Sequence, residues 1–302
     1  MRVIERGWVS SNTIAFCGHT GTDIVDTGYS LHAAQTVALV RHAIGSRPLD
    51  RMFNTHAHAD HIGGNAALKN AYPAARIAIP AGDADLVRDW DEQALHLAPM
   101  GQQCDRFSFD GTWRAGDLLT LGDCEWRAIA SPGHDMHSLM LWCERERILI
   151  SADALWEDGF GILFAALPPA SVTEPVFAAQ RATLDAIAAL QPRIVIPGHG
   201  APFCDVAGAL GRARGRLDYF IADPARIARN AAKVTLSFLL MIEGRLELSS
   251  LGERLARLSL LAAINRSVFG LDDAQFAALL AAELAKSRAA TCEEGWLLAA
   301  RR

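Results

Sequence analysis

The 302-residue sequence predicts a mixed fold of helices and strands, followed by a helical tail. Short apolar runs of strand type collect in two series, and a helical pattern follows each series. From about Arg212 onward, no convincing strand series continues and amphipathic or apolar helices take over. Hydrophobic residues make up 51% of the chain, which is enough for one large domain, or for one domain plus a smaller one. Composition and periodicity alone leave open whether the class is α/β or α+β.

The first part of the chain is predicted to begin with a hairpin and to continue with alternating helices and strands. Residues 18–21 form the turn of that hairpin. Val37, Val40 and Ile44 fall on one face of a helical pattern. In chain order, the predicted elements are a strand at 8–17, a strand at 22–26, a helix at 32–44, a strand at 51–54, a helix at 66–71 and a strand at 76–80.

The middle of the chain is predicted to contain two further hairpins, and the tail four helices. Gln191-Pro192 ends the long helix that precedes the last strand. Trp90, His96 and Phe107 lie in the irregular stretch 81–113, where they either line a substrate pocket or simply pack. The predicted elements are hairpins at 116–130 and 138–150, a helix at 174–190, a strand at 193–196, and helices at 212–223, 226–242, 249–264 and 272–288.

Charge and cysteine content narrow the function classes. The net charge of −5 argues against a nucleic-acid partner, because phosphates require an excess of positive charge. The six cysteines show no C-x-x-C spacing, and several lie in apolar runs, which favours buried thiols over disulfides and fits a reducing compartment. The first residues lack the apolar core of a signal peptide, and no run is long enough to cross a membrane. We therefore expect a cytoplasmic protein without a membrane partner.

The densest group of reactive side chains lies at residues 54–64, Asn-Thr-His-Ala-His-Ala-Asp-His-Ile-Gly-Gly. His56, His58, Asp60 and His61 lie on a predicted loop between a strand and a helix. Imidazole and carboxylate are ligands of zinc and of other borderline divalent metals. His56 and His58 can point to the same side of an extended segment, whereas Asp60 and His61 follow after the chain turns. One short loop could therefore serve two neighbouring metals.

This pattern, H-x-H-x-D-H followed by Gly-Gly, resembles the signature of the metallo-β-lactamase superfamily. The further ligands of that superfamily, a His, an Asp and a His at strand ends, match His134, Asp153 and His199 in order. The resemblance covers roughly residues 1–215. It implies an α+β fold, the four-layer αββα sandwich, with residues 1–215 as the catalytic domain and 216–302 as a C-terminal helical module. Some superfamily members carry a small winged-helix-like module there, and the tail is similar in layout.

The resemblance also implies a dinuclear metal-dependent hydrolase. His56, His58 and His134 would hold the first metal, Asp60, His61 and His199 the second, and Asp153 would bridge both. Zinc is the expected metal, with iron and manganese as alternatives. A bridging hydroxide would then attack an ester, thioester, lactone or related carbonyl bond. Asp60 and His137 are the candidate catalytic side chains, although His137 could also be structural.

The bridging carboxylate Asp153 argues against a true β-lactamase and fits the glyoxalase II, lactonase and sulfatase-like branches better. Glyoxalase II enzymes hold glutathione through basic residues after this Asp. Here residues 154–164 contain neither Lys nor Arg, so we expect a small, neutral and partly apolar substrate. Trp156 and Phe160 are the predicted substrate-binding side chains, with simple packing as the alternative.

Two rival functions follow from the same fold. A persulfide dioxygenase-type oxidoreductase would use one iron, bound by two His and an Asp, and the ligand residues alone do not exclude it. A scaffold without activity would be expected to lack ligands, and all of them are present. The expected partner is a small-molecule substrate. The apolar tail favours either a homodimer through the C-terminal helices or a tail packed on its own domain.

Overall fold

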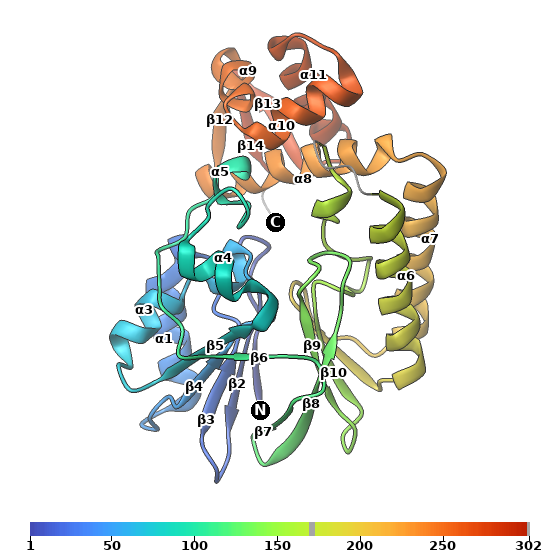
Figure 1. Ribbon diagram of the computed structural model, residues 1–302. Coiled ribbons are helices and arrows are strands. Elements are labelled where there is room, and N and C mark those ends of the chain that lie inside the picture. Colours follow the sequence, from blue (N-terminus) through green and yellow to red (C-terminus); the bar gives the residue numbers. More distant parts are fainter. Residues whose placement is uncertain (169–172, 301–302) are drawn as a thin grey trace.

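The computed structural model describes residues 1–168 and 173–300. Two β-sheets pack face to face, helices cover the outer face of each sheet, and a smaller C-terminal unit lies across one end (Figure 1). The predicted four-layer sandwich with a C-terminal helical region is confirmed.

The first sheet is mixed and six-stranded, in the order β1-β2-β3-β4-β5-β6. Strands β1 to β3 pair antiparallel, whereas β3 to β6 pair parallel. The strands are β1 (Arg2–Ile4), β2 (Thr13–Cys17), β3 (Thr22–Val25), β4 (Arg51–Phe53), β5 (Arg76–Pro80) and β6 (Gly111–Trp113). The H-x-H-x-D-H loop begins where β4 ends, at the carboxyl edge of the parallel part, where α/β sheets commonly bind ligands.

The second sheet has five strands in the order β11-β10-β9-β8-β7. Only β10 and β11 pair parallel in it. The strands are β7 (Leu118–Leu121), β8 (Cys124–Ala130), β9 (Leu139–Cys143), β10 (Ile148–Ala152) and β11 (Ile194–Pro197). Because β8 and β10 both run antiparallel to β9, the strands β8, β10 and β11 all end at one edge. His134, Asp153 and His199 follow those three ends.

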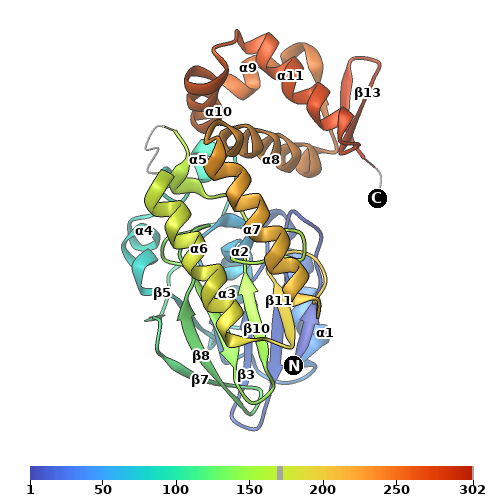
Figure 2. The same ribbon diagram turned by 90° about the vertical axis from the view of Figure 1, so that its right-hand side faces the viewer.

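Three hydrophobic clusters hold the layers together. Phe16, Phe53 and Trp126 belong to the cluster between the two sheets. A second cluster joins the first sheet to its outer helices, and the third joins the second sheet to α6, α7 and the C-terminal unit. Figure 2 shows α6 and α7 lying over the second sheet. Each sheet buries apolar side chains on both of its faces. This packing holds the two sheets together, so the strand ends that carry the donor residues lie at one common edge.

The helices keep close to the predicted ranges in the catalytic part of the chain. The long helices are α1 (Ala33–Ile44), α6 (Thr173–Leu190) and α7 (Val206–Ala222). The shorter ones are η1 (Ser30–His32), α2 (Ala59–Ile62), α3 (Asn65–Ala71), η2 (Ala81–Asp83), α4 (Ala84–Asp89), α5 (Leu97–Met100) and η3 (Phe164–Ala166). The domain boundary predicted between residues 215 and 216 lies within α7, and the division into domains stays a prediction.

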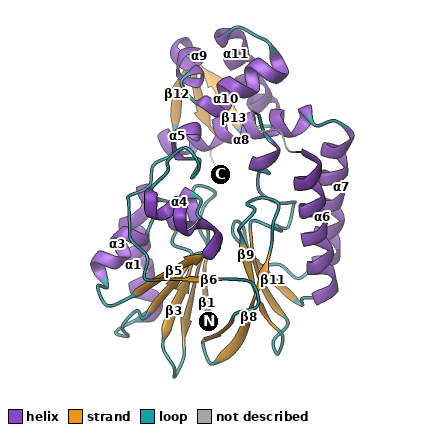
Figure 3. Cartoon of the chain, in the orientation of Figure 1, coloured by secondary structure: helices purple, strands orange, loops and turns teal. Residues whose placement is uncertain are grey.

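The C-terminal unit corrects two details of the predicted tail. It contains a small antiparallel sheet in the order β12-β14-β13, where no strands were expected (Figure 3). The predicted helix over 249–264 is two helices, because the chain leaves helical geometry at Leu258. The elements are α8 (Ala225–Glu243), β12 (Arg245–Glu247), α9 (Leu248–Ala256), α10 (Ser259–Ile264), η4 (Asn265–Phe269), α11 (Asp273–Lys286), β13 (Ala290–Glu293) and β14 (Trp296–Ala299).

Among the residues that the structure describes, no helix combines the length and the apolar character needed to cross a membrane.

Candidate metal centre

Seven side chains with metal-binding atoms meet at the edge where the strand ends of both sheets converge. They form two groups, and within each group one nitrogen or oxygen of every residue lies within 4.8 Å of those of the others. The first group is His56, His58 and His134, and the second is Asp60, His61, Asp153 and His199. The structure thus assembles the predicted residues in two neighbouring groups, and their role as metal ligands stays a prediction.

The first group consists of three imidazoles whose ring nitrogens face one another. Nδ1 of His58 lies 2.8 Å from Nε2 of His134, which in turn lies 3.2 Å from Nε2 of His56. The carbonyl of Ile162 accepts a hydrogen bond from Nδ1 of His134 at 2.6 Å, which leaves Nε2 of that ring as its lone-pair atom. Such an arrangement is suited to a borderline divalent cation.

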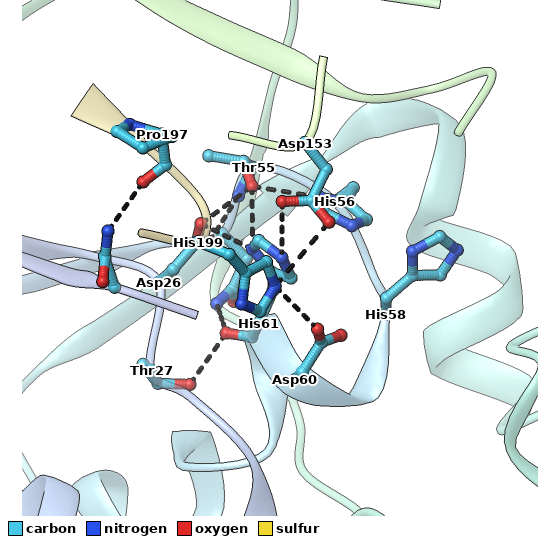
Figure 4. A network of polar contacts seen from close by, with 12 residues as sticks. Asp26, Thr27, Thr55, His56, His58, Asp60, His61, Asp153, Pro197 and His199 are labelled. Carbon is cyan, nitrogen blue, oxygen red and sulfur yellow. Dashed lines mark hydrogen bonds and ion pairs between the residues drawn. The ribbon is translucent and has the colours of Figure 1, made fainter. Parts of the chain in front are cut away.

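The second group combines two imidazoles with two carboxylates. Nε2 of His199 lies 3.0 Å from Oδ2 of Asp60 and 3.8 Å from Oδ2 of Asp153. Nε2 of His61 lies 3.4 Å from Oδ1 of Asp153. Figure 4 shows these side chains converging around His61 and His199. The mixed oxygen and nitrogen donors fit zinc, iron or manganese.

Asp153 reaches both groups. While its Oδ1 faces His61, its Oδ2 lies 3.5 Å from Nε2 of His134 in the first group. The preceding residue, Ala152, has a left-handed backbone with φ of 46°, a conformation that is costly for a residue with a Cβ. Gly198 allows the approach of β11, since a Cβ there would clash with Asp153 Oδ1 and lie 3.0 Å from the His61 ring. The local backbone therefore places this carboxylate between the two groups.

The electrostatics of the first group favour neutral imidazoles. Burial lowers the pKa of His56 and His58 well below the ordinary value, and the neighbouring imidazoles lower it further. Both rings therefore present lone pairs at neutral pH. Neutral imidazole is the form that binds a metal.

In the second group, the carboxylates stabilise positive charge, either on the imidazole of His61 or on a bound cation. Burial lowers the pKa of His61, but the carboxylates of Asp26, Asp153 and Asp60 outweigh burial and raise the pKa well above its ordinary value. For Asp153, burial raises the pKa, yet His61 and His199 outweigh it and hold the pKa well below normal. Burial also raises the pKa of Asp60, and the same two imidazoles leave it lowered. The carboxylates are therefore ionised, and a divalent cation would balance their charge.

A buried carboxylate behind the site was missed by the sequence analysis. Asp26 follows β3 and accepts hydrogen bonds from Nδ1 of His61 at 2.8 Å and from the backbone and hydroxyl of Thr55. This contact fixes Nδ1 of His61 as a donor, so Nε2 is the atom that faces the group. The available signal was positional, since Asp26 follows an apolar strand, as Asp153 does.

Several buried nitrogens of the site have no hydrogen-bond partner among the described residues. These atoms are Nε2 of His58, Nε2 of His61 and Nδ1 of His199. A buried polar atom without a partner is costly, so each calls for an explanation. A cation between the two donor groups would satisfy His61 directly. The chemistry of the donor set and this unpartnered nitrogen thus both fit a metal site.

A cavity of about 720 Å³ opens onto both donor groups. Trp8 stacks on the ring of His199, with ring centres 5.6 Å apart, and its edge contacts Trp156. The indole Nε1 of Trp156 donates a hydrogen bond to Oδ1 of Asp153 at 3.1 Å. His96, which stacks on Phe164, also lines the cavity. Aromatic side chains therefore wall the reactive groups.

Of the side chains predicted to bind substrate or to take part in catalysis, some line the cavity and others do not. Trp156 and Asp60 line the cavity, as expected for their predicted roles, which stay predictions. Phe160 is fully buried and contacts the ring of Phe220 and the guanidinium of Arg216, so its prediction as a cavity wall is corrected. Packing in the core of the second sheet holds it away from the cavity.

His137 lies beside the donor groups, outside the main cavity. Its Nδ1 lies 3.0 Å from Oδ1 of Asp83, which raises the pKa of this imidazole. Asp83, Asp135 and His137 form a third cluster of metal-binding side chains. The catalytic role predicted for His137 stays a prediction.

Comparison with known proteins places these residues in a family. Residues 6–199 match the sequence model of the metallo-beta-lactamase superfamily. A hydroxyacylglutathione hydrolase from Brucella anthropi is 27% identical over 180 residues, covering 60% of this chain and 55% of that protein. One from Rhodospirillum rubrum is 32% identical over 116 residues, covering 38% of each protein. The chain thus matches about half, or less, of the length of these relatives.

A solved structure resembles the chain over nearly its whole length. The metallo-beta-lactamase family protein from Thermus thermophilus covers 99% of this chain and 97% of its own, with a TM-score of 0.58 and 18% identity. At this identity, the likeness supports the fold alone, including the C-terminal unit.

Proposed function

Because the chain belongs to the metallo-β-lactamase superfamily, we propose that it is a dinuclear metal-dependent hydrolase. It cleaves an ester, thioester, lactone or related carbonyl bond of a small neutral substrate. The names of the curated relatives, hydroxyacylglutathione hydrolases, support a thioester or ester as the bond. Zinc is the proposed metal, because the first group offers three imidazoles, which are preferred ligands of zinc.

The position of Asp153 carries the proposal. Its Oδ1 faces His61 of the second group, and its Oδ2 lies between the two groups, 3.5 Å from Nε2 of His134 and 3.8 Å from Nε2 of His199. A carboxylate shared in this way supports two cations at short separation, as in dinuclear hydrolytic sites. When bound, the two metals would supply an activated water and would polarise the carbonyl that is attacked.

The side chains around the donor groups have separate tasks in the proposed reaction. Asp60 faces the cavity with an ionised carboxylate, so it can accept the proton of the attacking water. Asp26 keeps His61 in one tautomer and one orientation. Trp8 and Trp156 cover the second group with apolar rings, which restricts bulk water near the reacting bond.

A neutral substrate is favoured by the charges of the cavity. The segment after Asp153 contributes Trp156, Gly161, Ile162 and Phe164 to the lining. Arg288 is the sole Lys or Arg among the described lining residues, and it lies at the C-terminal unit. A substrate with several negative charges would find few partners here, which argues against glutathione itself as the leaving group.

The test combines metal analysis with a substrate screen. Protein purified without chelators is expected to contain about two zinc ions per chain by elemental analysis, and to hydrolyse simple esters, thioesters or lactones. His58→Ala is expected to reduce hydrolysis roughly 100-fold or more, while the circular dichroism spectrum is kept. Full activity of that variant with wild-type metal content would overturn the site assignment.

The persulfide dioxygenase alternative makes a different prediction for the same protein. It requires about one iron per chain, no zinc, and oxygen consumption with a persulfide substrate. That result would replace the hydrolase. The two complete donor groups favour the hydrolase, because a mononuclear iron site needs only one of them.

A further inference from the structure

Helix α8 presents an apolar stripe to the cavity above the donor groups. Val234, Ser237, Phe238 and Met241 follow the spacing i, i+3, i+4, i+7 and all line the cavity. The opposite face of the helix buries Ala232, Leu236 and Leu239 in the core of the C-terminal unit. One helix therefore serves both as a core element and as the roof of the cavity. Figure 1 shows α8 lying across this end of the sandwich.

The stripe is apolar and yet incompletely covered. Val234 is 39% exposed and Met241 is 38% exposed, although large aliphatic side chains on a structured helix are usually buried. Phe238 anchors the middle of the stripe by packing against Tyr29, with ring centres 5.2 Å apart. The stripe is therefore held in place at its middle, and its two ends remain open to a ligand in the cavity.

The facing wall of the cavity has the same character. Trp8, Met100, Ile162 and Phe164 line it, and Trp8 is 39% exposed. The donor groups contribute the floor through His58, Asp60, His134, Asp153 and His199. The apolar roof and walls are thus continuous with the reactive floor. A ligand that fills the space touches both.

We infer that the substrate carries an apolar chain that lies along the α8 stripe, with its carbonyl at the donor groups. From Val234 to Met241 the stripe extends about 10 Å along the helix. A neutral chain fits, because Arg288 is the lone Lys or Arg of the described lining and the two lining carboxylates, Asp60 and Asp153, belong to the donor groups. The inference rests on the proposed hydrolase function.

The first test is a chain-length series on the metal-loaded protein. Hydrolysis of p-nitrophenyl acetate, butyrate, octanoate and dodecanoate is compared by kcat/KM. Each methylene buried in the cavity is expected to raise kcat/KM about fourfold until the stripe is filled. A parallel series with octyl and ethyl acetate tells whether the chain belongs to the acyl group or to the alcohol. No rise in either series would overturn the inference.

A pair of matched variants ties the preference to the stripe. Val234→Glu introduces a carboxylate at the cavity roof and is expected to reduce the ratio of octanoate to acetate hydrolysis at least tenfold. Ile221→Glu on α7 is the control, since Ile221 is 42% exposed outside the cavity lining, and it should keep the wild-type ratio. Met241→Glu provides a second stripe variant. An unchanged ratio in both stripe variants, with wild-type metal content, would overturn the inference.

A binding measurement separates failure of this inference from failure of the proposed function. Calorimetry compares octanoate with acetate, and tighter binding of octanoate that Val234→Glu removes supports the apolar site. If the protein binds octanoate selectively but hydrolyses no ester, the proposed function fails and the chain-binding site stands. If it hydrolyses esters without chain preference and binds both acids alike, the function stands and the apolar site fails.

Discussion

The two donor groups of the metal centre lie side by side but differ in charge. The first is built from imidazoles alone, whose pKa values burial pushes down. The second surrounds two imidazoles with carboxylates, which hold the pKa of His61 up. The short loop supplies two imidazoles to the first group but a carboxylate and an imidazole to the second, and the strands of the second sheet then add one more imidazole to the first group and Asp153 and His199 to the second. The comparison teaches that the first group is ready to bind a metal at neutral pH, whereas in the second a cation must displace a proton.

The largest effect on both donor groups is expected from a change of Asp153, the residue that they share. Asp153→Asn keeps the size of the side chain but removes its charge and leaves a single amide oxygen, which cannot serve both groups as a carboxylate can. We expect metal content to fall below one per chain and kcat/KM to drop on the order of 1,000-fold, as the loss of several kcal/mol of charge stabilisation implies. Asp158→Asn, in the same loop and exposed, should leave both values unchanged. Retention of two metals in Asp153→Asn would show that the groups are independent.

A second pair of variants removes one group at a time. His58→Ala should lose the metal of the first group and His199→Ala that of the second, each leaving about one metal per chain. We expect hydrolysis to fall roughly 100-fold or more in both, because polarisation of the carbonyl and activation of water need both cations. His42→Ala on the surface of α1 is the control. Elemental analysis decides the outcome, and loss of both metals from either variant would mean that the groups bind cooperatively.

A third pair of variants, with smaller expected effects, changes one carboxylate that lies behind each donor group. Asp26→Asn weakens the support of His61, and Asp135→Asn removes the carboxylate whose Oδ2 lies 3.9 Å from Nε2 of His58. Asp26→Asn should reduce metal affinity about 10- to 100-fold, because it weakens a hydrogen bond to a donor imidazole. Asp135→Asn should have a smaller effect, because 3.9 Å is too long for a hydrogen bond. Each loss should be confined to its own group. Titration against a competing chelator, in the background of His199→Ala or His58→Ala, assigns each loss to one group. A loss in the opposite group would contradict the geometry.

The smallest expected effect concerns Trp156. Trp156→Phe keeps an aromatic wall and removes only the hydrogen bond to Asp153 Oδ1, so metal affinity should fall less than about tenfold. Trp156→Ala also removes the wall, and we expect it to raise KM more than it lowers metal content. Steady-state kinetics with elemental analysis separates the two effects. If Trp156→Ala loses its metal, the indole supports the second group and does not act mainly as a substrate wall.

The four donor residues of the loop could be predicted from their spacing, whereas His134, Asp153 and His199 were identified through the resemblance to the superfamily. Spacing along six residues needs no knowledge of tertiary structure. Asp26 also follows an apolar strand, but that position alone does not tell that its side chain faces the site. It reaches His61 only because β3 pairs parallel with β4, with Val25 beside Phe53, and strand register is not visible in local sequence.

The errors in the fold have similar causes. The tail strands β12 to β14 have three or four residues each, and β12 contains two charged residues around Leu246, so no alternating pattern stands out. Pairing within the small sheet stabilises them against their own weak preference. Phe160 was predicted to line the cavity, whereas Phe164 of the same segment does so, because an apolar loop has no periodicity that tells which side chain faces inward.

The two faces of α8 have a consequence for how such a protein can diversify. Leu236 and Leu239 set how the helix rests on the core, and Val234 and Met241 on the same helix border the cavity. A change of packing volume in the C-terminal core therefore shifts the roof over the metal centre without touching any donor residue. The tail can thus acquire new ligand preferences by ordinary core substitutions, while the reactive edge of the sandwich stays as it is.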